Sequence, residues 1–352
     1  MTPEILVLLI ISHINYSMYN SRIAGMGAYV PENIVTNDDL SKIMDTNHAW
    51  IEERTGIEER RHIKEGDGNS TAIMGVKAAK IALERANMTA QDIDMIVFAT
   101  LSPDFYFPGC GVQVQEMLDM RTVPALDVRN QCSGFIYALS TADQFIKTGM
   151  YKNVLVIGSE NHSGGLDMTT RGRNVSVIFG DGAGAAVLTR EEDNAKGILS
   201  THLHSEGKHA LELALKGPST MEWVPELIEK NPQEDIPYYP YMNGQFVFKN
   251  AVVRFSEVII EGLEKNKLKS EDIDMLIPHQ ANLRISQFVQ KQFGLNDDQV
   301  YNNIQKYGNT TAASIPIALT EAWENGKIKE GDTVVLAAFG SGFTWASAII
   351  KW

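Results

Sequence analysis

Three polar side chains stand where the sequence could support catalysis, and the first is a cysteine. Cys132 follows a short apolar run at 125–128 and precedes a helical stripe that begins at Phe135. At a helix N-terminus, free N–H groups and the helix dipole favour an anion, so we expect a lowered thiol pKa and a nucleophilic thiolate. A small buried hydrophobe is the alternative interpretation. Cys110, in the segment FPGCG, lacks these features and is predicted to be a packing residue.

The second side chain is an imidazole. His279 ends the apolar run 275–277, directly after Pro278, which blocks further ladder pairing. Strand ends open onto sites in α/β folds, so we expect this imidazole to point into a crevice. A structural, hydrogen-bonded histidine is the alternative. No histidine or carboxylate stands three or four residues further on, so we predict no metal site.

The sequence repeats itself at a fixed distance. DIDM occurs at 92–95 and again at 272–275, an offset of 272 − 92 = 180 residues, and the apolar runs at 153–157 and 333–337 keep the same offset. Each copy alternates helices with strands, which is typical of parallel βαβ units. We therefore predict an α/β protein of two similar halves packed as one body.

The third side chain, Asn309, gains its interest from this repeat. In the segment GNTTAAS at 308–314, an asparagine would ordinarily cap the next helix or form a turn. However, 309 − 180 = 129, which is just before Cys132. Asn309 thus occupies the second half's version of the turn that presents the thiol. If a pseudo-two-fold axis relates the halves, the two turns meet, and we expect one pocket that holds Cys132, His279 and Asn309.

The composition excludes several classes of protein. The 352 residues carry 31 Lys+Arg against 44 Asp+Glu, a formal charge of −13, which speaks against nucleic-acid binding. Two cysteines 132 − 110 = 22 residues apart exclude a disulfide scaffold and suit a reducing, cytoplasmic location. The strongly apolar stretch at 5–12 is far shorter than the roughly 20 residues of a membrane span, so none is expected. Residues 1–17 are predicted to be an N-terminal extension outside the fold, and the Pro- and Tyr-rich segment 217–244 a surface loop that shapes substrate access.

Four segments stand out together: NQCSGF at 130–135, PHQANLR at 278–284, GNTTAAS at 308–314 and FGSGFTW at 339–345. In this order they resemble the motifs of the beta-ketoacyl-acyl-carrier-protein synthase III family, in the thiolase-like superfamily. The resemblance covers about residues 18–352. It implies a thiolase-like fold layered α-β-α-β-α, with an N-terminal half at 18–199 that holds the cysteine and a C-terminal half at 200–352 that holds the histidine and asparagine.

The resemblance implies an acyltransferase that condenses an acyl-CoA primer with malonyl-acyl carrier protein, releases carbon dioxide and initiates fatty acid synthesis. Cys132 would carry the acyl group, and the N–H groups of Cys132 and Ser341 would hold the thioester oxyanion. His279 and Asn309 would hydrogen-bond the malonyl thioester carbonyl while the enolate forms, and Phe339 would crowd the malonyl carboxylate. These donors would act where negative charge develops. No cofactor is implied, because coenzyme A enters as a substrate thioester.

The resemblance also implies a binding site for coenzyme A. Trp50 and Arg54 look like the pair that stacks on and pairs with the adenine nucleotide, and Arg173 matches the other arginine of that site. Arg171 stands two residues earlier in the chain, so the resemblance leaves open whether Arg171 or Arg173 meets coenzyme A. Solvated surface arginines are the alternative interpretation.

Two protein contacts are implied as well. Phe107 resembles the residue that reaches across a homodimer into the partner's acyl pocket. An acidic carrier protein needs a basic patch on a chain of such negative charge. The residues where the family places this patch are Lys249, Arg284 and Lys291. The sequence departs from the family pattern at three places, namely Gln245, where many members have Asn, the long 217–244 loop, and residues 1–17. These departures leave open which acyl primer the protein uses and which pathway consumes its product.

Three other functions compete with this interpretation. Papain-like proteases also carry Cys, His and Asn in this order with about 130 to 150 residues between Cys and His, and here 279 − 132 = 147. The signature around their cysteine is absent, and the duplicated α/β pattern differs. A catalytically idle, carrier-binding subunit would be expected to lack one of the three polar residues, and none is missing. A specialised synthase of secondary metabolism remains the serious alternative.

Overall fold

The computed structural model describes residues 19–221 and 239–352. The predicted extension at 1–17 and the middle of the 217–244 loop lie outside the described residues. Within the described parts, no helix combines the length and the apolar composition needed to cross a membrane.

The first repeat is a five-stranded mixed sheet with helices on both faces. Its strand order is β1-β7-β6-β4-β5, in which β4, β5 and β6 run parallel and β7 and β1 antiparallel to their neighbours. The strands are β1 (Asn20–Tyr29), β4 (Met95–Ala99), β5 (Ala125–Val128), β6 (Asn153–Glu160) and β7 (Gly182–Glu191), and the main helices are α4 (Thr71–Arg85), α5 (Cys110–Met117) and α6 (Gly134–Lys147).

The second repeat is a four-stranded sheet of matching topology, in the order β11-β12-β13-β8. Its strands are β8 (Gly197–Ser205), β11 (Met275–Pro278), β12 (Thr333–Gly340) and β13 (Thr344–Lys351), and its main helices are α9 (Gly244–Lys265), α10 (Leu283–Phe293) and α12 (Ser314–Glu324). Helices α6 and α12 begin 314 − 134 = 180 residues apart, and strands β6 and β12 begin 333 − 153 = 180 apart. The offset found in the sequence is therefore the offset of the structural repeat. Strand β8 pairs with β13 of the second sheet from Gly197 to Ser205, with a register shift that skips Leu199. The division of the chain into halves at 18–199 and 200–352 stays a prediction.

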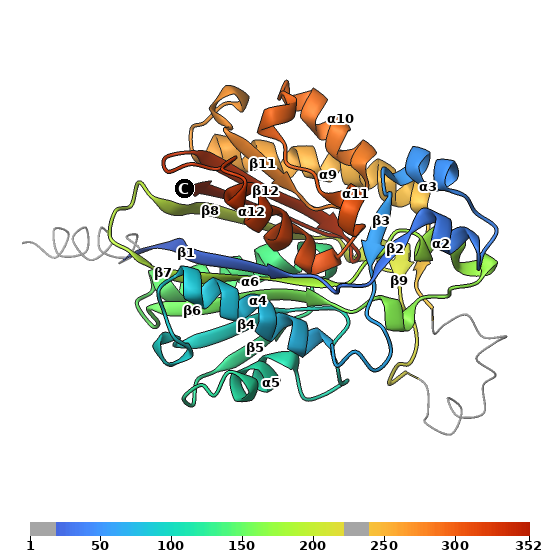
Figure 1. Cartoon of the computed structure of the whole chain (residues 1–352). Helices are drawn as coiled ribbons and strands as arrows, with labels where there is room; N and C mark the ends of the chain where they lie inside the picture. The colour runs from blue at the N-terminus through green and yellow to red at the C-terminus, as the bar shows by residue number, and fades with distance from the viewer. Residues whose placement is uncertain (1–18, 222–238) are drawn as a thin grey trace, which may run out of the picture.

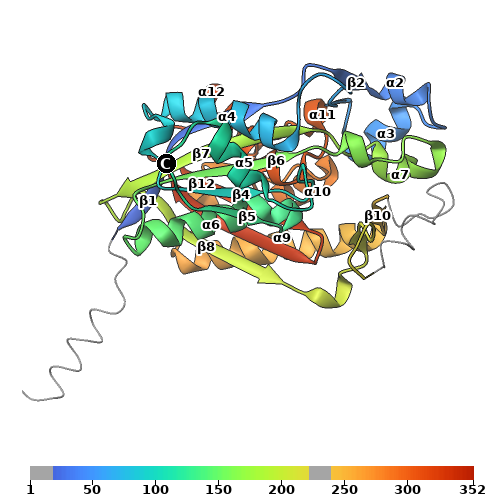
Figure 2. The same ribbon diagram turned by 90° about the horizontal axis from the view of Figure 1, so that it is seen from below.

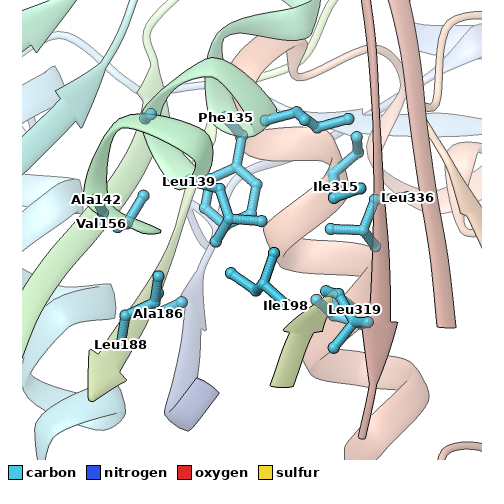
Figure 3. Close-up of a cluster of buried hydrophobic side chains, with 14 of the residues drawn as sticks. Phe135, Leu139, Ala142, Val156, Ala186, Leu188, Ile198, Ile315, Leu319 and Leu336 are labelled. Atoms are coloured by element: carbon cyan, nitrogen blue, oxygen red, sulfur yellow. The ribbon is translucent and has the colours of Figure 1, made fainter. Parts of the chain in front are cut away.

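The two repeats stack into five layers (Figure 1). Helices α6 and α12 lie between the sheets, where Phe135 and Leu139 of α6 pack against Ile315 and Leu319 of α12 (Figure 3). The outer face of the first sheet is covered by α4 and α5, and the outer face of the second by α9 and α10. Most residues of both central helices are buried between the sheets, although Gln144 of α6 and Trp323 of α12 are exposed.

Shorter elements gather at one end of the molecule, opposite the C-terminus (Figures 1 and 2). They form a rim around the carboxyl ends of the central strands of both sheets. These elements are β2 (Ile34–Thr36), α2 (Asn37–Ser41), α3 (His48–Thr55), β3 (Glu59–Arg61), α7 (Arg173–Ser176), β9 (Leu213–Ala214), β10 (Tyr241–Met242) and α11 (Ile304–Tyr307).

Strand β1 approaches α4 so closely that only glycine fits at the crossing. A Cβ atom on Gly27 would lie 2.3 Å from the carbonyl oxygen of Ala78, and one on Gly25 would lie 2.4 Å from that of Ala82. Real Cβ atoms do not come so near to backbone, so the helix would have to move away from the sheet. The spacing between the outer layer and the first sheet therefore depends on these glycines.

We expect Gly27→Ala to lower the free energy of unfolding by about 1–3 kcal/mol, the range typical of overpacked sites. Gly207→Ala is the matched control, because no atom lies within 4 Å of a Cβ built there. Urea denaturation monitored by circular dichroism measures both. Equal effects of the two substitutions would contradict the close contact between β1 and α4.

Candidate active site

Cys132 lies in the sharp turn between β5 and α6. A single turn of 3₁₀ helix, η2 (Gln131–Ser133), carries it, and Gln131 adopts a left-handed φ of 44°. The carboxyl end of β12 packs directly on the thiol, since a Cβ on Gly340 would lie 2.9 Å from Sγ of Cys132. The cysteine is only 7% exposed but lines the large cavity of the protein. The strand-to-helix turn expected from the sequence is therefore present.

The resting thiol is not the thiolate that we expected. Burial, with a further contribution from the charge of Glu160, raises the pKa of Cys132 to about 12. The nearby backbone N–H groups of Ser341 and of Cys132 itself lower the pKa of the thiol, but less than burial raises it. The helix N-terminus therefore does not overcome desolvation.

His279 lies at the carboxyl end of β11 and lines the same cavity. Its Nδ1 atom is 2.6 Å from Oγ of Ser314, at the start of α12. Its Nε2 atom is buried, and no group of the described residues hydrogen-bonds it. Burial lowers the pKa of His279 to about 3, so the ring is neutral at physiological pH.

Asn309 is held by its own turn. Its Oδ1 atom accepts a hydrogen bond of 2.9 Å from the N–H of Thr311, which leaves the Nδ2 amide group for a molecule in the cavity. Thr311 has a φ of 48°, which is rare for a β-branched residue. Its Oγ1 atom lies 2.8 Å from Nε2 of the buried His162. Since 311 − 131 = 180, Thr311 is the repeat counterpart of Gln131, and both repeats bend the chain at the same place.

One cavity of about 910 Å³ brings these groups together from opposite repeats. Cys132 comes from the first repeat, and His279 and Asn309 come from the second. Phe339, on β12, lines the cavity beside them. A thiol, a neutral imidazole and an amide around one apolar space can form a covalent thioester and donate hydrogen bonds to a developing enolate.

Trp50 and Arg54 line the cavity, whereas Arg173 contacts the Trp50 ring without lining the cavity. The guanidinium of Arg54 lies 4.7 Å from the ring centre of Trp50, and that of Arg173 lies 5.3 Å from it. Arg173 also pairs with Asp45, whereas Arg171 pairs with Asp167. The contact with Trp50 therefore distinguishes Arg173 from Arg171.

Two of the three expected carrier-protein residues also line this cavity, namely Lys249 and Arg284, and both are exposed. Lys291 is exposed further along α10 and does not line the cavity. Phe107 is 82% exposed on the loop before α5 and does not line the cavity of its own subunit.

Sequence reasoning missed two groups that organise the site. Glu160, at the end of β6, is fully buried and accepts hydrogen bonds from the segment after β4 and from the N–H of Ala312. Burial raises its pKa to about 7. A charged residue at the end of the otherwise apolar run NVLVIGSE is the feature of the sequence that could have identified Glu160. Ser314 stood within the quoted GNTTAAS segment, but its contact with His279 spans 35 residues and is visible only in three dimensions.

Comparisons with known proteins identify the family. Two family models match, described as "3-Oxoacyl-[acyl-carrier-protein (ACP)] synthase III" over residues 126–207 and its "C terminal" part over residues 263–352. A beta-ketoacyl-[acyl-carrier-protein] synthase III from Caldanaerobacter subterraneus subsp. tengcongensis is 47% identical, covering 94% of this chain and 97% of that protein. The chain belongs to the beta-ketoacyl-acyl-carrier-protein synthase III family. One from Aliivibrio fischeri is 45% identical over 94% of this chain and 99% of that protein.

Solved structures of beta-ketoacyl-acyl-carrier-protein synthase III give the same answer for the fold. The enzyme from Aquifex aeolicus matches with a TM-score of 0.86 and 43% identity, covering 94% of this chain and all of that one. The predicted thiolase-like fold and the acyltransferase class are therefore confirmed, and the protease interpretation is wrong. The priming beta-ketosynthase of the R1128 polyketide pathway also matches, with a TM-score of 0.85 and 29% identity.

The neutral His279 predicts a specific dependence of stability on pH. The unfolded chain binds a proton at this ring near pH 6.5, whereas the folded chain does so only near pH 3. Protons therefore favour the unfolded state, and this contribution to stability, complete above about pH 6.5, is lost as the pH falls. We expect the unfolding free energy of the wild type minus that of His279→Gln to decrease from pH 7.5 to about pH 5. Urea titrations at several pH values measure this difference. Glu160 has the opposite effect on the pH dependence of stability, but it is present in both proteins, so its contribution cancels in the difference. A difference independent of pH would contradict the neutral buried ring.

Proposed function

We propose that this chain condenses an acyl-CoA primer with malonyl-acyl carrier protein by way of an acyl-cysteine, and that Cys132, His279 and Asn309 carry the reaction. The observation that supports the proposal is the convergence of these three side chains, from two repeats, on one cavity. Family membership supports the reaction class.

The first half-reaction transfers the acyl group. The sulfur of Cys132 attacks the thioester carbonyl, the bond from this carbon to the coenzyme A sulfur breaks, and coenzyme A leaves as a thiol with the cysteine's proton. The N–H groups of Cys132 and Ser341, both near enough to the sulfur to lower its pKa, stabilise the negative oxygen of the tetrahedral intermediate. Because the resting thiol has a raised pKa, proton loss accompanies attack rather than preceding it.

The second half-reaction forms the carbon–carbon bond. The malonyl carboxylate leaves as carbon dioxide, and its bonding electrons pass into the thioester as an enolate. Nε2–H of His279 and Nδ2–H of Asn309 donate to the enolate oxygen. The enolate carbon then attacks the acyl carbonyl on Cys132, and the carbon–sulfur bond breaks to release the 3-oxoacyl product. The bonding electrons remain on Cys132 as a thiolate, which takes one proton from water to restore the resting thiol. Phe339 lines the cavity beside this point, and its apolar ring disfavours the charged carboxylate over neutral carbon dioxide.

The mouth of the cavity supports a nucleotide thioester and an acidic carrier as substrates. Trp50 offers an aromatic face, and Arg54 and Arg173 offer charge for phosphates. Lys249 and Arg284 place positive charge at the same opening, and Lys291 extends it along α10. On a chain with a charge of −13, this local excess steers an acidic partner to the cavity.

Substitutions of the three residues separate the half-reactions. We expect Cys132→Ala to abolish labelling by radioactive acyl-CoA, because it removes the atom that forms the thioester. His279→Ala and Asn309→Ala should retain labelling and lose condensation by roughly 10²–10³-fold, the cost typical of removing one oxyanion donor. His279→Gln is the matched variant, since its amide nitrogen can replace the donor at Nε2. Mass spectrometry of the acyl-enzyme and of the product measures both steps. Equal loss of acyl transfer in all variants would contradict these roles, and an unlabelled wild type would favour the idle subunit.

We also propose that the protein is a homodimer in which β5 pairs with its symmetry mate and Phe107 enters the partner's acyl pocket. Strand β5 ends its sheet with one neighbour, β4, and Leu126 on it is 40% exposed. Three consecutive aromatic residues at 105–107 are exposed beside it. An unprotected edge strand next to an apolar patch is typical of a buried interface.

Two substitutions test the dimer. Leu126→Arg should place a charge in the interface, and light scattering after size exclusion should then show a monomer. Phe107→Ala should remain a dimer and shift the preferred primer to longer chains, measured with a panel of acyl-CoA primers. A wild-type monomer with full activity would contradict both the dimer and the role of Phe107.

A further inference from the structure

The ring of His279 lines the cavity, and its two nitrogens differ in their surroundings. Its Nδ1 atom lies 2.6 Å from Oγ of Ser314, and its Nε2 atom has no partner among the described residues. Both side chains are buried, with 3% of His279 and 1% of Ser314 exposed. Water therefore has little access to either group.

The hydrogen bonds around Ser314 determine which atom accepts the hydrogen of its hydroxyl group. The N–H of Gln280 points at Oγ of Ser314 from 3.4 Å and can only donate. The hydroxyl oxygen thus accepts from Gln280. Among the described residues its one other hydrogen-bond partner is Nδ1 of His279, the single acceptor within reach of its hydrogen, so the hydroxyl donates to Nδ1. A neutral ring that accepts at Nδ1 must carry its hydrogen at Nε2.

The repeat argues against a purely structural role for this hydroxyl. Since 314 − 134 = 180, the counterpart of Ser314 is Gly134, which begins α6. The first repeat forms the same turn and the same helix start with no side chain at this position. The fold therefore does not require a hydroxyl here.

We infer that Ser314 is a positioning residue that fixes His279 as the Nε2–H tautomer, so that the imidazole presents a donor to the enolate oxygen. The inference rests on the role proposed above for His279. Without Ser314, Nδ1 loses its donor and the ring can also take the opposite tautomer, which presents a lone pair to the developing negative charge.

The test combines kinetics with histidine nitrogen spectroscopy. We expect Ser314→Ala to lower the rate of condensation by about ten- to a hundredfold, a loss no larger than that caused by removing the His279 donor itself. The rate of acyl transfer to Cys132 should stay within about twofold of the wild type. In protein with ¹⁵N-labelled histidine, the wild-type His279 signal, assigned by its loss in His279→Gln, should show a protonated Nε2 and an unprotonated Nδ1. Ser314→Ala should show a mixture of tautomers.

Ser286→Ala is the matched control. Ser286 is also a buried serine on a helix at this end of the second repeat, and its hydroxyl has no hydrogen-bond partner among the described residues. The control should leave the ratio of condensation to acyl transfer unchanged, and an equal fall of this ratio in both variants would overturn the inference. A proton on Nδ1 in the wild type, or full condensation by Ser314→Ala, would also overturn it. Full condensation by His279→Ala would instead contradict the proposed role of His279, whatever its tautomer.

Discussion

Desolvation of polar groups at the junction of the two repeats is the constraint on which the site depends. Cys132 and His279 are both buried there, and burial favours the uncharged form of each, because it raises the pKa of the thiol and lowers that of the imidazole. These two groups therefore act as hydrogen-bonding dipoles rather than as fixed charges. Donors held in a dry site need no reorganisation when charge develops on a substrate, which is the condition under which they stabilise a transition state most.

The duplication explains how one backbone turn serves two purposes. Both repeats bend the chain at a left-handed residue, Gln131 in one and Thr311 in the other, before a central helix. The first copy presents a thiol, and the second presents an amide and holds an imidazole. The ends of strands β6 and β12 have also diverged. Since 340 − 160 = 180, Gly340 at the end of β12 is the repeat counterpart of Glu160 at the end of β6. Glycine allows β12 to reach the sulfur, whereas the carboxylate of Glu160 gathers N–H groups from the surrounding loops.

The exterior contrasts with this neutral interior. The chain is acidic as a whole, yet Arg54, Lys249 and Arg284 line the mouth of the cavity. Charge at the surface acts over a distance and is screened by salt, so the role that we propose for these residues is to select and orient a partner rather than to bind it tightly. On this proposal, recognition at the mouth and chemistry at the base rely on different interactions, and substitutions in one need not disturb the other.

The sequence alone determined the fold class, the offset of the repeat and three side chains that line one cavity. These features follow from local patterns, namely strands alternating with helices and a repeated spacing, together with motifs whose order is characteristic. The sequence misjudged the state of the thiol, because a helix N-terminus is a local feature whereas burial depends on everything packed around the sulfur. It also could not show that Gly340 contacts Cys132, that Arg173 rather than Arg171 reaches Trp50, or that Ser314 meets His279. These contacts join residues distant in the chain, and only the packing of two repeats against each other decides which of them meet.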